Sequence, residues 1–329
     1  MTTTLFPVRL QQKTVIATDI VLLTLVRPDH QLMPAFEAGA HVDLHLPNGL
    51  IRQYSLCNSP TDRRYYQLGV LLDPHSRGGS AAIHQLPVGA DLMLSQPRNL
   101  FPLHDGQHHV LIAGGIGITP ILCMAEELQR RGQSFELHYC VRSRDRQAFT
   151  ELLQQPPLSN SVVLHIDDDP TTEALPLSSL LVHHEHRQLY VCGPGGLIKA
   201  VNASALEAGW PASQIHFEQF AVASAGSDAA SSSVQGSTTP NNDFEIVIAS
   251  SGQVIPVAAT QSAANAMQAA GIPVELSCEQ GICGSCLTAV VDGLPDHRDY
   301  FQSEAEKAAN ERFTPCCSRS HSRRLVVDL

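Results

Sequence analysis

Five cysteines lie close together in the C-terminal part of this 329-residue chain and limit what that part can fold into. Cys278, Cys283 and Cys286 stand within the nine residues CEQGICGSC, and Cys316 and Cys317 follow in the stretch FTPCC. Three kinds of structure use cysteines at this density: a disulfide knot, a zinc site and an iron–sulfur cluster. The redox state of the protein's compartment and the spacing of the cysteines decide among these three structures.

The rest of the chain predicts a reducing compartment, which argues against a disulfide knot. The start, MTTTLFPVRLQQ, lacks the charged and apolar regions of a signal peptide. The longest apolar run, Val110 to Ala125, contains three glycines and a proline and is too short to span a bilayer. The cysteine count is nine, an odd number. We therefore expect a cytoplasmic protein with reduced thiols.

The charge balance narrows the range of partners. The chain has 21 basic and 32 acidic residues, a net charge of −11. This argues against binding to nucleic acid or to an anionic membrane, and it favours protein partners with basic faces.

The cysteine spacing favours an iron–sulfur cluster over zinc. Structural zinc sites usually combine two C-x2-C pairs, or one pair with histidines. Here the pattern is C-x4-C-x2-C, the plant-type spacing for a [2Fe–2S] cluster, and 29 residues separate Cys286 from Cys316. Gly281 and Gly284 let the loop fold around a cluster and direct N–H groups at its sulfurs. We expect Cys278, Cys283 and Cys286 to be ligands, with the fourth ligand at Cys316 or Cys317.

The chain divides into three segments and one linker, and the last segment contains this loop. Residues 1–105 are rich in short β-type runs separated by turns, including Asn48-Gly49, which predicts a small antiparallel barrel. Residues 106–223 alternate strand and helix patterns, as in ITPILCMAEELQRRG, which predicts a doubly wound parallel sheet. Residues 224–242 are rich in Ser, Gly, Ala and Thr and predict a flexible linker. Residues 243–329 form a third domain with a hairpin, an Ala-rich helix and a closing strand.

A one-electron cluster needs an electron donor, and three upstream motifs are candidates. GGIGITP, Gly114 to Pro120, stands where a strand meets a helix and suits a pyrophosphate, although an ordinary strand–helix turn has the same form. RQYSL, Arg52 to Leu56, suits a phosphate and a flat ring, although such a string is often a plain strand. VCGPGG, Val191 to Gly196, ends another strand of the parallel sheet, where ligands bind in this fold class.

Taken together, RxYS, GGIGITP, CGP and a C-terminal plant-type ferredoxin domain resemble the phthalate dioxygenase reductase family. SRGGS, HFEQF and CCSR before LVVDL also match, so the resemblance covers essentially the whole chain. It implies an FMN-binding barrel, an NAD-binding α/β domain and a β-grasp ferredoxin domain.

The resemblance also assigns site residues. FMN would be held by Arg52, Tyr54, Ser55, Gly78, Gly79, Ser80 and Phe220, with Ser55 near the reactive N5. NADH would be held by Gly115, Gly117, Thr119, Cys192, Gly193 and Pro194, with Cys192 near the nicotinamide. The tail resembles plant-type ferredoxins, which selects Cys316 as the fourth ligand and leaves Cys317 as a small buried residue. Cys57, Cys123 and Cys140 are interpreted as packing residues.

The implied function is that of the reductase component of a Rieske-type oxygenase or demethylase. A hydride passes from NADH to FMN, and single electrons pass through the cluster to the oxygenase. We expect a monomer that docks transiently and partly electrostatically. The alternatives are an FAD-containing reductase of another soluble oxygenase and a redox-sensing module without NADH oxidation. The 16 histidines are interpreted as surface residues.

Overall fold

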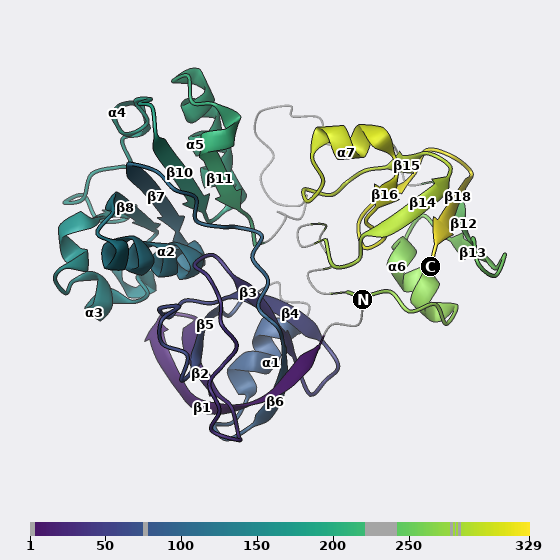
Figure 1. The fold of residues 1–329 in the computed structure, drawn as a ribbon, viewed down its shortest axis with the longest axis horizontal. Coiled ribbons are helices and arrows are strands. Elements are labelled where there is room, and N and C mark those ends of the chain that lie inside the picture. Colours follow the sequence, from purple (N-terminus) through teal and green to yellow (C-terminus); the bar gives the residue numbers. More distant parts are fainter. Residues whose placement is uncertain (1–3, 75–77, 221–241, 277–278, 280, 282–283) are drawn as a thin grey trace. The chain divides into compact units, whose positions relative to one another are not determined.

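The structure is a computed structural model that describes residues 4–74, 78–220, 242–276, 279, 281 and 284–329. It consists of two compact units, Met1–Phe220 and Ala221–Leu329 (Figure 1). The predicted linker lies outside the described residues, apart from Asn242. No helix in the described part of the chain is long and apolar enough to cross a bilayer.

The first unit begins with a curled antiparallel sheet of six strands. They are β1 (Leu5–Ala17), β2 (Ile20–Val26), β3 (His41–His45), β4 (Ile51–Ser55), β5 (Tyr66–Leu71) and β6 (Asp91–Ser95), in the order β4-β3-β6-β1-β2-β5. Leu56, just after β4, pairs with Leu68 of β5, so the outer strands meet and the sheet closes into the predicted barrel. The helix α1 (Gly79–Gln85) packs beside β5.

The alternation along β1 shows why these residues form a barrel wall. Phe6, Val8 and Leu10 are buried, whereas Pro7 and Arg9 between them are exposed. A period of two places one face in the core and the other in water. The predicted Asn48-Gly49 turn joins β3 to β4.

A parallel sheet completes the first unit and confirms the doubly wound prediction. Its strands are β7 (His108–Gly114), β8 (Ser134–Val141), β9 (Val162–Ile166), β10 (Arg187–Cys192) and β11 (Ile215–Glu218), in the order β11-β10-β7-β8-β9. The helices are α2 (Ile118–Arg131), α3 (Thr150–Leu153), α4 (Leu177–Leu180) and α5 (Gly195–Glu207). Leu111 and Ala113 of β7 share a core with α2, whereas Val110 and Ile112 share another with α5. Helices therefore cover both faces of the sheet.

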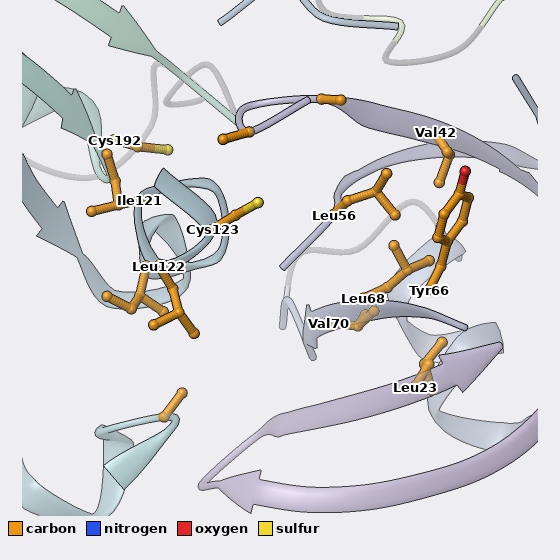
Figure 2. Packing of buried hydrophobic residues seen from close by; sticks show 14 of the residues in the cluster. Leu23, Val42, Leu56, Tyr66, Leu68, Val70, Ile121, Leu122, Cys123 and Cys192 are labelled. Atoms are coloured by element: carbon orange, nitrogen blue, oxygen red, sulfur yellow. The ribbon is translucent and has the colours of Figure 1, made fainter. Parts of the chain in front are cut away.

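The barrel and the parallel sheet share one hydrophobic core. Figure 2 shows side chains from both, including Tyr66 and Leu68 of the barrel and Leu122 and Cys123 of α2. The Cys123 thiol donates to the Asn58 carbonyl at 3.3 Å. Because apolar packing runs continuously across the two sheets, the barrel and the parallel sheet form one packed base for any site at their junction.

The second unit is a mixed sheet crossed by a helix, as expected for a β-grasp ferredoxin domain. Its five-stranded sheet consists of β13 (Val254–Val257), β12 (Phe244–Ile248), β18 (Arg324–Asp328), β14 (Thr288–Asp292) and β16 (Arg312–Phe313), in that order. β15 (Pro295–Asp296) pairs with β17 (Arg319–Ser320). The helices are α6 (Ala263–Ala269), which buries Ala263, Ala266 and Met267 in this unit's core, and α7 (Glu304–Ala309).

The prediction that the histidines lie on the surface is wrong for four of them. His41, His109, His138 and His165 are buried. His138 Nδ1 lies 2.9 Å from His165 Nε2, and His109 Nε2 lies 3.0 Å from a backbone carbonyl. Neutral imidazoles are tolerated inside a protein when they form such bonds. His41 is different, because both of its ring nitrogens are buried without a hydrogen-bond partner among the described residues, and this burial lowers its pKa to about 4.

Candidate functional site

The turn after β7 presents bare backbone at the carboxyl edge of the parallel sheet. Gly115 adopts a left-handed conformation, with φ of 53°, and a Cβ placed on it would meet nothing within 4 Å. Thr119, in the first turn of α2, is buried, and its hydroxyl donates to the Ile116 carbonyl at 3.0 Å. A flexible turn with open space at a strand–helix junction suits a pyrophosphate.

The turn after β10 packs against the turn after β7. A Cβ on Gly117 would lie 2.3 Å from the Cys192 carbonyl oxygen, and a Cβ on Gly193 would lie 2.9 Å from Gly114 Cα. Pro194 directly precedes α5. Because β7 and β10 are neighbours, and the chain reaches β8 and β11 on opposite sides of them, this is the switch point where doubly wound sheets bind ligands. The structure thus brings together the residues predicted to bind NADH.

The barrel contributes a cation beside the start of α1. The side chain of Arg52 lies so close to Gly79 that a Cβ there would be 2.6 Å from Arg52 Nε. Gly78 precedes α1, and the Ser80 hydroxyl accepts from the Asp73 backbone N–H at 3.2 Å. A guanidinium beside a glycine backbone fits a phosphate group.

The other end of β4 reaches the parallel sheet. Ser55, the last residue of β4, is buried, and its hydroxyl donates to Glu218 Oε2 at 3.4 Å. Glu218 is the last residue of β11 and pairs in register with Cys192 of β10. Ser55, Cys192 and Glu218 therefore gather at the junction of the barrel and the sheet.

Glu218 is an acid kept neutral by its surroundings. The residue is partly exposed, and neighbouring protein atoms desolvate its carboxyl group. This desolvation raises its pKa from 4.5 to about 8, although the bond from Ser55 acts in the opposite direction. Burial also raises the pKa of the Cys192 thiol well above its ordinary value. A neutral carboxyl group can hold or release a proton near neutral pH.

Sequence reasoning did not identify Glu218. The signal was present in HFEQF, where an acid ends a short strand between two aromatic residues. Its partner Ser55 is 163 residues away, so neither sequence periodicity nor local spacing links them.

Two further residues predicted to bind the flavin, Tyr54 and Phe220, take no part in the contacts among Ser55, Cys192 and Glu218. Tyr54 is partly buried against the core, and desolvation raises the pKa of its hydroxyl. Phe220 follows β11 by two residues and is 38% exposed. An exposed aromatic ring so close to Glu218 suits an aromatic cover for a flat cofactor.

In the second unit, the described residues include two of the four predicted cluster ligands. Cys286 and Cys316 pack at the same edge of its core, and contact with Cys286 is the largest cause raising the Cys316 pKa to about 12. Cys278 and Cys283 lie outside the described residues.

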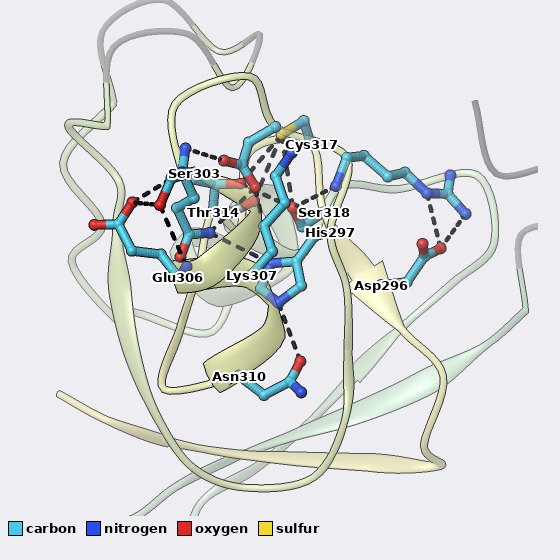
Figure 3. A network of polar contacts seen from close by, with 12 residues as sticks. Asp296, His297, Ser303, Glu306, Lys307, Asn310, Thr314, Cys317 and Ser318 are labelled. Carbon is cyan, nitrogen blue, oxygen red and sulfur yellow. Dashed lines mark hydrogen bonds and ion pairs between the residues drawn. The ribbon is translucent and has the colours of Figure 1, made fainter. Parts of the chain in front are cut away.

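Cys317 lies beside the hydroxyl groups of Thr314 and Ser318 (Figure 3). Its sulfur is 3.3 Å from the Thr314 hydroxyl, which is itself 2.8 Å from the Ser318 hydroxyl. A Cβ on Gly281 would lie 2.4 Å from the Cys317 sulfur, so this side chain fills the space next to Gly281.

The predicted groups fit these residues. Open glycine backbone suits a dinucleotide, a cation beside α1 suits a flavin phosphate, and paired thiols suit a cluster. Ser55 and Glu218 supply hydrogen-bonding groups where a flavin ring and a nicotinamide would meet.

Sequence profiles of two families match the chain. The 2Fe-2S iron-sulfur cluster binding domain matches residues 246–321. The N-terminal domain of dimethylamine monooxygenase subunit DmmA-like proteins matches residues 93–215.

Whole-length relatives extend the match to both units. A vanillate O-demethylase oxidoreductase of Pseudomonas sp. is 52% identical over 95% of this chain and 96% of its own. The reductase subunit of a tert-butanol monooxygenase / tert-amyl alcohol desaturase from Aquincola tertiaricarbonis is 40% identical over 98% of this chain and 95% of its own.

A solved structure agrees with the sequence comparison. Phthalate dioxygenase reductase, described as a modular structure for electron transfer from pyridine nucleotides to [2Fe-2S], matches with a TM-score of 0.77 and 34% identity, covering 99% of this chain and 98% of that one. The chain belongs to the phthalate dioxygenase reductase family of iron–sulfur flavoprotein oxidoreductases.

Proposed function

We propose that this protein is the reductase component of a two-component Rieske-type demethylase, and that it moves electrons from NADH through FMN and a [2Fe–2S] cluster to the oxygenase. The observation that carries this proposal is the junction at which Ser55, Cys192 and Glu218 meet. It joins a barrel strand to the carboxyl ends of two parallel strands, which supports a flavin site next to a dinucleotide site. Residues 1–105, 106–223 and 243–329 would carry FMN, NADH and the cluster.

FMN supplies hydride acceptance and release of single electrons, and the cluster supplies one-electron transfer. Arg52 with Gly78, Gly79 and Ser80 would hold the FMN phosphate, and Tyr54 and Phe220 would hold the ring. Ser55 donates to Glu218, whose neutral carboxyl group would hold a proton at the flavin site.

The remaining residues bind the coenzyme and the cluster. Gly115, Gly117, Gly193 and Pro194 form the two packed turns that would hold the pyrophosphate. Thr119 fixes the first turn of α2 through its bond to Ile116, and Cys192 would lie near the nicotinamide. The cluster ligands are Cys278, Cys283, Cys286 and Cys316.

The partner is an oxygenase, and relatives at different distances indicate its substrate class. The 52% identical relative serves a vanillate O-demethylase, whereas the 40% identical relative serves a tert-butanol monooxygenase. The higher identity supports a methoxylated aromatic acid as the substrate of the partner. We expect a cytoplasmic monomer that docks transiently.

The docking surface is centred on Tyr300. This side chain is 56% exposed, and its backbone N–H donates to the Gly281 carbonyl at 2.9 Å, which places it beside the cysteine loop. Gln302 donates its backbone N–H to Asp299 at 2.8 Å, so the turn that carries Tyr300 is braced. Exposed, rigidly held tyrosines commonly anchor protein interfaces. An overall charge of −11 favours a basic complementary patch on the oxygenase.

The test is anaerobic mixing of the purified protein with NADH, followed at flavin and cluster wavelengths. We expect the flavin absorbance to fall first and the cluster absorbance to fall afterwards. Adding a vanillate-type oxygenase with its methoxylated substrate should then yield formaldehyde. Extraction of the flavin should release FMN. Release of FAD would favour the reductase of a different oxygenase class, and failure to oxidise NADH with any acceptor would favour the redox-sensing alternative.

A further inference from the structure

Three arginines follow the strand that lies next to the glycine-rich turn. β8 is the neighbour of β7, and Arg142, Arg144 and Arg146 come directly after its last residue, Val141. In dinucleotide-binding sheets this position faces the adenosine ribose, and an arginine there accepts the 2′-phosphate of NADPH. The arginines alone would therefore predict a preference for NADPH.

Arg144 already forms an ion pair with Asp169, an acid that follows the next strand, β9. Arg144 Nε donates to Asp169 Oδ2 at 2.8 Å, and a second guanidinium nitrogen donates to the same oxygen. The other carboxylate oxygen, Oδ1, accepts from the Thr171 backbone N–H at 2.9 Å and from the Thr171 hydroxyl at 2.5 Å. Both oxygens of Asp169 are thus held in place.

The backbone fixes Asp169 beside Arg144. After β9, the Asp167 N–H donates to the Val141 carbonyl at 3.0 Å, and the Asp168 N–H donates to the Arg142 carbonyl at 3.1 Å. The Asp169 side chain is 14% exposed, whereas the Arg144 side chain is 63% exposed. If the guanidinium turned away, a mostly buried carboxylate would lose its cation, which is unfavourable.

The tip of the hairpin between β1 and β2 contacts the other charged residues of this turn. Arg146 donates to Asp19 Oδ2 at 3.3 Å, and the Thr18 hydroxyl donates to Asp145 Oδ2 at 2.7 Å. The barrel therefore helps to hold the arginine turn. Within the described residues Arg142 makes no side-chain ion pair.

We propose that Asp169 is a specificity-determining residue, which holds Arg144 away from a 2′-phosphate and so weakens the use of NADPH relative to NADH. A 2′-phosphate would have to displace a carboxylate that Thr171 also holds, and it would be repelled by it. This inference rests on the proposed function, because it concerns the same coenzyme site.

The test compares the holoprotein with Asp169→Asn, which keeps an acceptor for Thr171 and removes the charge. We expect kcat/KM for flavin reduction with NADPH to rise at least tenfold relative to kcat/KM with NADH. Calorimetric titration should find tighter binding of 2′,5′-ADP, with 5′-ADP changed less than twofold. The double variant Asp169→Asn, Arg144→Ala should lose the gain in both measurements.

Two further variants decide between this interpretation and a general charge effect. Asp19→Asn removes an acid that pairs with Arg146 of the same turn without releasing Arg144, and it should change the ratio of NADPH to NADH use less than threefold. Arg144→Ala alone should leave NADPH use within about twofold, because a sequestered arginine contributes little.

Several results would overturn the proposal: no gain in Asp169→Asn, an equal gain in Asp19→Asn, or a tenfold loss of NADPH use in Arg144→Ala. Absence of NADH-dependent flavin reduction in the unaltered protein would instead contradict the proposed function.

Discussion

Replacing Glu218 by glutamine should stabilise the first unit relative to the unaltered protein, and the difference should grow as pH rises. Glutamine has the shape of a protonated glutamate and can still accept the bond from Ser55. Below pH 4.5 the carboxyl group is protonated in the folded and unfolded chains alike. Between pH 4.5 and about 8 only the unfolded chain loses the proton, so the native protein is destabilised as pH rises, and the loss is complete above pH 8.

The size of the effect follows from the same pKa shift. The rise from 4.5 to about 8 spans about 3.5 on the pH scale, and each pH unit corresponds to about 1.4 kcal/mol. The upper limit is therefore about 5 kcal/mol at pH 8.5. Half of that limit would already separate the midpoints of thermal unfolding by about 5 °C or more.

Trp210 provides the assay because it is the only tryptophan in the chain. It is buried in the first unit, where its Nε1 donates to the Leu181 carbonyl at 2.7 Å. Its fluorescence should report thermal unfolding of that unit at pH 5 to 8.5. Glu218→Gln and the unaltered protein should differ least at pH 5 and diverge steadily above it. Glu207→Gln, an exposed control on α5, should follow the unaltered protein throughout. Parallel curves for Glu218→Gln and the unaltered protein across the whole range would refute the reasoning.

Three other predictions concern the cluster and the partner. Cys283→Ser should lose the cluster spectrum and keep NADH-dependent flavin reduction. A variant that loses flavin reduction together with the cluster would contradict the proposed order of carriers. Cys316→Ala should abolish the cluster spectrum while Cys317→Ala preserves it, because Cys316 packs against the core that holds Cys286, the other described ligand. The opposite pattern would move the ligand by one position. Glu279→Lys and Tyr300→Ala should each slow coupled turnover at least threefold without altering flavin reduction by NADH. Rising salt should also slow coupled turnover, because the Debye length falls below about 10 Å, and insensitivity to all three changes would place docking elsewhere.

Most of the fold could be predicted because its elements follow simple periodicities. Alternation in β1 and the Asn48-Gly49 turn predicted barrel strands, and both are present. Pro120 in the first turn and Gly132 at the end of a periodic segment predicted α2, which ends with Gly132 in a left-handed conformation.

The elements that were missed carry weak apolar signals. α7 buries none of its residues, so no hydrophobic stripe marks it, although the capping box of Ser303 and Glu306 is a usable signal at its start. β11 has only four residues, one of them exposed and none fully buried. The histidines were misplaced because a buried imidazole depends on a partner such as His165 for His138, and the fold alone brings these together.

The continuous core between the barrel and the parallel sheet has a consequence for protein engineering. A chimaera that exchanges only residues 106–220 to alter the coenzyme would separate Cys123 from the Asn58 carbonyl and Asp145 from Thr18. The interchangeable module is residues 1–220 as a block. Grafts that cut after Phe220 should keep their flavin and fold, whereas grafts that cut near residue 105 should need matching substitutions on both sides of the seam.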